Sequence, residues 1–61
     1  MTVPIERQVQ CVERELKFRR RVYARRVVEK RMTKTQMDDE LEAMEAVLAT
    51  LQSIAEGQRL I

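Results

Sequence analysis

Histidine and tryptophan are absent from this chain of 61 residues, and cysteine, glycine, proline, tyrosine and phenylalanine each occur once. Without histidine the chain lacks a usual zinc ligand and the commonest general base. The single cysteine, Cys11, excludes an intramolecular disulfide. The only serine, Ser53, has no evident base to activate it. These absences predict a protein that is not an enzyme and has no catalytic residue, metal site or cofactor.

Long apolar runs are also missing. No segment has the positive, apolar and small-residue parts of a signal peptide, and none approaches the roughly 18 apolar residues of a membrane helix. We therefore expect no membrane contact and a cytoplasmic location. A lone thiol fits a reducing compartment. The alternative for Cys11 is a disulfide with its own copy across a two-fold axis.

The scarcity of glycine, proline and aromatic residues, with 36% charged residues, is typical of helices and not of strands. A chain this short buries a thin core, and without disulfides or zinc the remaining source of stability is self-association. The composition therefore predicts an all-α fold with a single domain over residues 1–61.

A first helix is predicted over about residues 4–30, beginning at Pro4 because a first helical residue needs no N–H. Its main apolar stripe is interrupted by Arg19 and consists of Ile5, Val9, Val12, Leu16, Tyr23 and Val27. A second apolar set projects to roughly the opposite side and consists of Cys11, Phe18, Val22 and Met32. One hairpin cannot cover both sets, so the pattern indicates a second copy of the chain.

A second helix is predicted over about residues 34–56, after a turn at about 30–33. Thr33 and Gln36 have the spacing of a capping box, and Thr35 with Asp38 is the alternative. Gly57 predicts that the helix stops near Ala55 or Glu56 and leaves a tail over residues 57–61. A heptad pattern contains Met37, Leu41, Met44, Leu48, Leu51 and Ala55, and a parallel stripe contains Ala43, Val47, Thr50 and Ile54.

The short connection predicts an antiparallel two-helix hairpin that dimerises into a four-helix bundle. A continuous helix through residues 28–37 is the structural alternative, because no glycine or proline lies between the helices. The residues expected in the dimer or hairpin core are Val9, Val12, Leu16, Tyr23, Val27, Met37, Leu41, Met44, Val47, Leu48, Leu51 and Ile54.

Charge divides the chain into two parts. Residues 1–34 carry eleven Lys/Arg and four Glu, a net +7, whereas residues 35–61 carry one Arg and six acids, a net −5. The arginines lie beside apolar residues, a mixture enriched at protein interfaces. The expected partner-binding residues are Arg14, Phe18, Arg21, Val22 and Arg25. Two alternatives stay open: nucleic-acid binding by the basic helix, and arginines that merely balance the acids of the second helix.

Three segments carry a family resemblance: RRRVYARRV at 19–27, KRMT at 30–33 and ELEAMEAV at 40–47. Over about residues 12–51 the chain resembles small helical-hairpin proteins encoded by phages and prophages, and among these the quorum-sensing anti-activators of Pseudomonas phages. It departs from them at Lys30, where glycine is expected. The resemblance implies a dimer in the host cytoplasm that inhibits a host protein, such as a transcriptional regulator. A structural phage component and an inert prophage remnant are alternatives.

Overall fold

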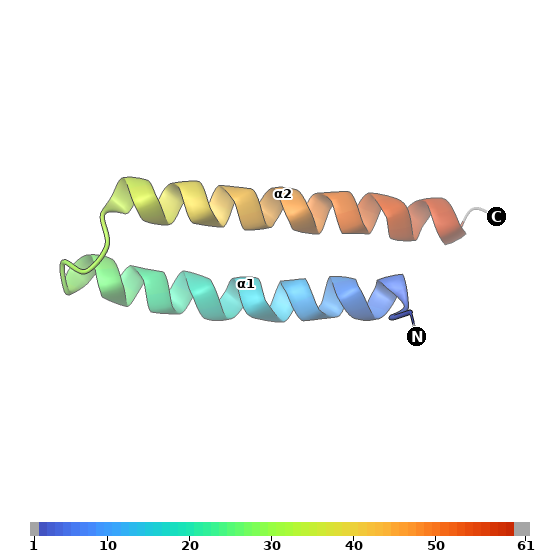
Figure 1. The fold of residues 1–61 in the computed structure, drawn as a ribbon, viewed down its shortest axis with the longest axis horizontal. Helices are drawn as coiled ribbons and strands as arrows, with labels where there is room; N and C mark the ends of the chain where they lie inside the picture. Colours follow the sequence, from blue (N-terminus) through green and yellow to red (C-terminus); the bar gives the residue numbers. More distant parts are fainter. Residues whose placement is uncertain (1, 60–61) are drawn as a thin grey trace.

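The computed structural model describes residues 2–59 and contains two antiparallel helices. Helix α1 spans Ile5–Val28 and helix α2 spans Lys34–Arg59. They lie side by side along their whole length, so that both chain ends are found at one end of the molecule and the turn at the other (Figure 1). The hairpin measures 48 × 19 × 16 Å. The predicted all-α hairpin is confirmed, and the alternative of a continuous helix through residues 28–37 is wrong.

Helix α1 begins one residue later than its sequence predicts. Pro4 is the N-cap and not the first helical residue, because its backbone is extended, with ψ at 146°. Its carbonyl accepts hydrogen bonds from the N–H groups of Arg7 and Gln8, both at 3.1 Å. The side-chain amide of Gln8 also donates a hydrogen bond to the Val3 carbonyl, at 2.9 Å. Proline therefore ends the preceding extended segment and lets the helix start at Ile5.

The end of α1 is a Schellman motif built on a residue that carries a side chain. The N–H of Arg31 donates to the Arg26 carbonyl at 2.8 Å, and the N–H of Lys30 donates to the Val27 carbonyl at 3.1 Å. The C-cap of the helix is Glu29, and these two bonds require a left-handed conformation at the residue that follows it. Lys30 takes that conformation, with φ at 61°. The helix therefore ends at Val28, before the predicted boundary at about residue 30.

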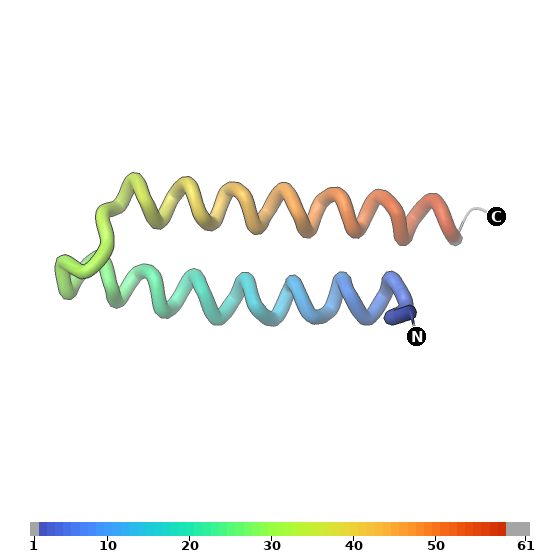
Figure 2. Tube along the Cα trace, in the orientation of Figure 1, coloured from blue at the N-terminus to red at the C-terminus, as the bar shows by residue number. Residues whose placement is uncertain are grey.

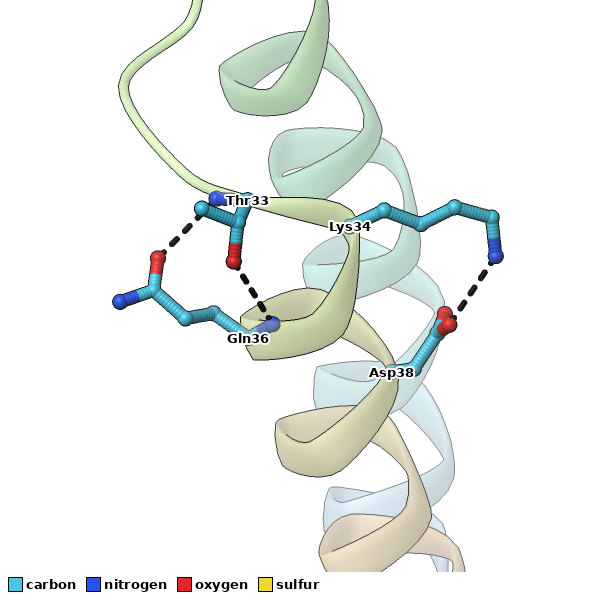
Figure 3. A network of polar contacts seen from close by, with 4 residues as sticks. All are labelled: Thr33, Lys34, Gln36 and Asp38. Atoms are coloured by element: carbon cyan, nitrogen blue, oxygen red, sulfur yellow. Dashed lines mark hydrogen bonds and ion pairs between the residues drawn. The ribbon is translucent and has the colours of Figure 1, made fainter.

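Helix α2 begins with the capping box that the sequence predicts. The Thr33 hydroxyl accepts a hydrogen bond from the Gln36 N–H, and the Gln36 side-chain oxygen accepts one from the Thr33 N–H, both at 3.0 Å (Figure 3). The Lys34 ammonium pairs with Asp38 one turn further on, also at 3.0 Å. Asp38 is thus engaged by Lys34, and Thr33 rather than Thr35 is the cap.

The far end of α2 differs from the prediction. The helix passes through Gly57 and continues to Arg59, so the predicted end at Ala55 or Glu56 is wrong. Gly57 does not adopt a positive φ, and a Cβ added there would meet nothing within 4 Å. Glycine permits a left-handed cap without requiring one, and helical glycine costs only about 1 kcal/mol relative to alanine. Residues 60 and 61 of the predicted tail lie outside the described residues.

The core between the helices is a single row of side chains. Only Ile5, Leu16 and Ala55 are buried among the described residues. Most of the predicted core is half-buried: Val9, Val12, Tyr23, Val27, Met37, Leu41, Met44, Leu48 and Leu51. Val47 and Ile54, which the sequence assigns to the core of the hairpin or of a dimer, are each 47% exposed and lie outside the core of the single hairpin. Each helix buries one stripe against its single neighbour, and these two residues lie beside that stripe.

Candidate interaction surfaces

Several arginines of α1 are occupied within the hairpin. Arg19 takes a place in the inner stripe and donates from Nε to Glu15 at 2.9 Å. This hydrogen bond, with smaller contributions from Tyr23, raises the pKa of the Arg19 guanidinium. Arg20 crosses to α2 and pairs with Glu45 at 3.0 Å. Arg26 lies over the Tyr23 ring, 5.7 Å from its centroid. Of these contacts, the pair of Arg20 with Glu45 joins the two helices, whereas those of Arg19 and Arg26 lie within α1.

A second group of arginines lies on the side of α1 that faces away from α2. This arginine ridge consists of Arg7, Arg14, Arg21 and Arg25. All four side chains are exposed, and none of them forms an ion pair within residues 2–59. The Arg21 guanidinium lies over the ring of Phe18, 6.0 Å from its centroid, and Phe18 is 51% exposed. The ridge thus offers positive charge beside an exposed aromatic ring.

One flank of the hairpin is charged. Arg20 and Glu45 meet there, and the flank continues to the open end as a depression of about 510 Å³. Its lining consists of Glu6, Val9, Gln10, Glu13, Gln52, Ala55 and Glu56. The three carboxylates are exposed. This depression is an open polar surface between the helices and not an enclosed cavity that could hold a small molecule away from water.

The opposite flank is apolar. We define the apolar flank by its six residues: Cys11, Phe18 and Val22 from α1, and Ala43, Val47 and Ile54 from α2. Val22 is half-buried and the other five are exposed. Phe18, Val47 and Ile54 are three of the five exposed large hydrophobic residues in residues 2–59. The other two, Val3 and Val28, lie before the start and at the end of α1.

The structure divides the predicted partner-binding residues between these surfaces. Arg14, Arg21 and Arg25 lie on the ridge, Val22 lies on the apolar flank, and Phe18 lies between the two. Sequence reasoning did not identify the pairing of Arg20 with Glu45. It assigned Val47 and Ile54 to the core of the hairpin or of a dimer, without placing them on one flank of the hairpin. Their position one residue before the heptad residues Leu48 and Ala55 was the signal that could have placed them on a flank.

Neither helix of the described residues has the combination of length and apolar character that crossing a membrane requires. No protein-family model, no curated protein and no solved structure matches the chain.

Proposed function

We propose that this protein is a protein-binding module that inhibits or modulates a partner by occupying an acidic part of its surface. The observation that carries the proposal is the exposure of the arginine ridge beside Phe18, while neighbouring arginines are used inside the hairpin. Planar guanidinium groups bind carboxylates through two parallel hydrogen bonds, and arginine next to an aromatic ring is enriched at interface hot spots.

The ridge differs in charge from the rest of the molecule. Helix α2 carries six of the ten acids, so a partner that approached α2 would meet negative charge. A partner with surface carboxylates is attracted to the outer side of α1 and repelled from α2. The charge pattern therefore favours one docking side. The resemblance to phage hairpins suggests a host protein, such as a transcriptional regulator, as the partner.

Reversal of charge on the ridge tests this proposal. The double variant Arg14→Glu, Arg21→Glu should lose at least about tenfold in affinity for the partner, since each truncated or reversed hot-spot contact costs about 1–2 kcal/mol. The measurement is capture of host proteins by the tagged chain, identified by mass spectrometry, followed by titration of the captured partner.

The matched control is Lys17→Glu, Arg31→Glu, which changes the net charge equally at exposed residues outside the ridge. Circular dichroism should give the same helicity for both double variants. Equal affinity of the two variants would contradict a role for the ridge.

Nucleic-acid binding is the second candidate, because the same exposed arginines could neutralise phosphates. Titration of the wild-type chain with a duplex DNA oligonucleotide at increasing salt distinguishes the two. Affinity for DNA that falls steeply with salt and is lost in the ridge variant would favour nucleic acid. Absence of DNA binding at low salt, with capture of a protein, would favour the protein partner.

A further inference from the structure

The ion pair between Arg20 and Glu45 fixes how the flanks of the two helices correspond. Arg20 follows the inner residue Arg19, Glu45 follows the inner residue Met44, and the two side chains meet on one flank. In antiparallel helices the residues that follow the inner positions share one flank, so those that precede them share the other. Val22 precedes Tyr23, and Val47 and Ile54 precede Leu48 and Ala55. These apolar residues of both helices therefore lie on the same side of the hairpin.

The same ion pair sets which residues are level along the hairpin. Because the helices run in opposite directions with equal rise, each step forward in α1 matches one step back in α2 (Figure 2). Phe18 lies two residues before Arg20 and Val47 lies two residues after Glu45, so these two are level. In the same way, Val22 lies two residues after Arg20 and is level with Ala43, two residues before Glu45. Cys11 and Ile54 are each nine residues away. Every residue of the apolar flank is thus level with an apolar residue of the other helix.

Two polar residues in the middle of this flank already have hydrogen-bond partners in their own helices. Glu15 is level with Thr50. The Glu15 carboxylate is paired with Arg19 at 2.9 Å, and the Thr50 hydroxyl donates to the Ala46 carbonyl at 3.0 Å. Covering the flank would leave each group with at least one hydrogen-bond partner, which lowers the cost of burying it.

We infer that a second copy of this chain docks on the apolar flank, with the turns of both copies at the same end, to form a four-helix bundle. A two-fold axis parallel to the helices then sets α1 of each copy against α2 of the other. Residues that are level within one hairpin become opposite between the copies. Phe18 faces Val47 of the second copy, Val22 faces its Ala43, and Cys11 faces its Ile54.

Charge favours this arrangement over the alternative. Arg25 and Glu40 are level, five residues from the ion pair, so each Arg25 meets Glu40 of the second copy at the edge of the interface. A two-fold axis across the helices would instead set the basic α1 of one copy against the basic α1 of the other, which like charges disfavour. The whole hairpin measures 48 × 19 × 16 Å, so one full side of it is comparable in size with the roughly 800 Å² per partner of a standard interface.

The first test disrupts the flank. The double variant Val47→Glu, Ile54→Glu should convert the dimer to a monomer in analytical ultracentrifugation at micromolar concentration. Its matched control, Ala46→Glu, Ser53→Glu, carries the same charges one residue earlier on α2, about 100° around the helix, and should remain a dimer. A wild-type chain that is monomeric and fully helical would overturn the inference, whether or not another protein binds the flank. So would equal association of the two variants.

The second test uses Cys11, the only native thiol, as a probe and does not depend on whether the first variant folds. Ile54→Cys should give a disulfide-linked dimer on mild oxidation, resolved by a non-reducing gel, because position 54 of one copy faces Cys11 of the other. Ser53→Cys, turned away from the interface, should crosslink at most one tenth as much. The wild type, whose two Cys11 residues lie on diagonal helices, should also crosslink little. Equal crosslinking of Ser53→Cys and Ile54→Cys, or efficient crosslinking of the wild type, would overturn this orientation.

This interface shares Phe18 with the surface proposed to bind a partner, but it uses neither Arg14 nor Arg21. The ridge variant Arg14→Glu, Arg21→Glu leaves the apolar flank intact, so it should remain a dimer while losing the partner. If the wild type dimerises but the ridge variant binds the partner as tightly as the wild type does, the proposed binding function has failed. If the ridge variant loses the partner but the wild type is a monomer, the proposed interface has failed.

Discussion

Lys30 is the residue at which local sequence and backbone conformation conflict. Its φ of 61° belongs to the left-handed region, where a side chain costs roughly 1–2 kcal/mol. The two Schellman bonds from Lys30 and Arg31 hold it there. The turn thus closes through a residue that carries a side chain, and the strain lies in this one residue.

Replacement of Lys30 by glycine should stabilise the protein by about 1 kcal/mol, because relief of the left-handed strain exceeds the entropy that glycine loses on folding. Chemical denaturation followed by circular dichroism measures the change. Lys30→Ala removes the charge and keeps the Cβ, so it should bring no comparable gain. Equal stabilisation by alanine and glycine would mean that charge, and not backbone strain, matters at this position.

At the scale of the helices, the start of α2 is the best-determined boundary in the chain. Thr33 and Gln36 satisfy one another's backbone N–H groups, and the helix starts at Lys34 as the sequence predicts. The half-buried Met32 and Met37 occupy the two positions of a hydrophobic staple on either side of this box. Local chemistry alone therefore separates α2 from the turn.

Thr33→Ala should destabilise the protein by about 1 kcal/mol through loss of the N-cap, measured by thermal or chemical denaturation. Thr35→Ala removes the same side chain two residues later, where no capping bond is made, and should change stability by less than about 0.5 kcal/mol. If both substitutions cost the same, the reciprocal hydrogen bonds do not define the start of α2.

The whole molecule has little interior of its own. Ile5, Leu16 and Ala55 are its buried residues within 2–59, and the Arg20–Glu45 pair is about half exposed on both sides, with side-chain exposures of 52% and 54%. An ion pair of that exposure contributes at most about 1 kcal/mol, so it sets register more than stability. The exposed Phe18, Val47 and Ile54 of the apolar flank are apolar surface that association could bury.

Association on that flank should make stability depend on protein concentration. A hundredfold increase in concentration should stabilise the folded dimer by up to about 2.7 kcal/mol and raise the melting temperature by several degrees. Thermal melts at about 5 and 500 µM measure this shift, and Val47→Glu, Ile54→Glu should abolish it. Superimposable melts of the wild type would contradict association as a source of stability.

The sequence by itself determined the two helices, their antiparallel order, the capping box at Thr33 and most of the inner stripe. These features follow from interactions between residues three or four apart, which composition and spacing record directly. It also placed the arginine ridge on one side of α1, since helical periodicity orders exposed residues as well as buried ones.

Only the tertiary structure decided which residues of the two helices are level, that Val47 and Ile54 lie outside the hairpin core, and that Gly57 stays helical. A helical pattern gives the angle of each side chain around its own axis but not the register against a neighbour. Register depends on the turn geometry at Lys30 and on cross-helix contacts such as Arg20 with Glu45, which join residues 25 positions apart in the chain.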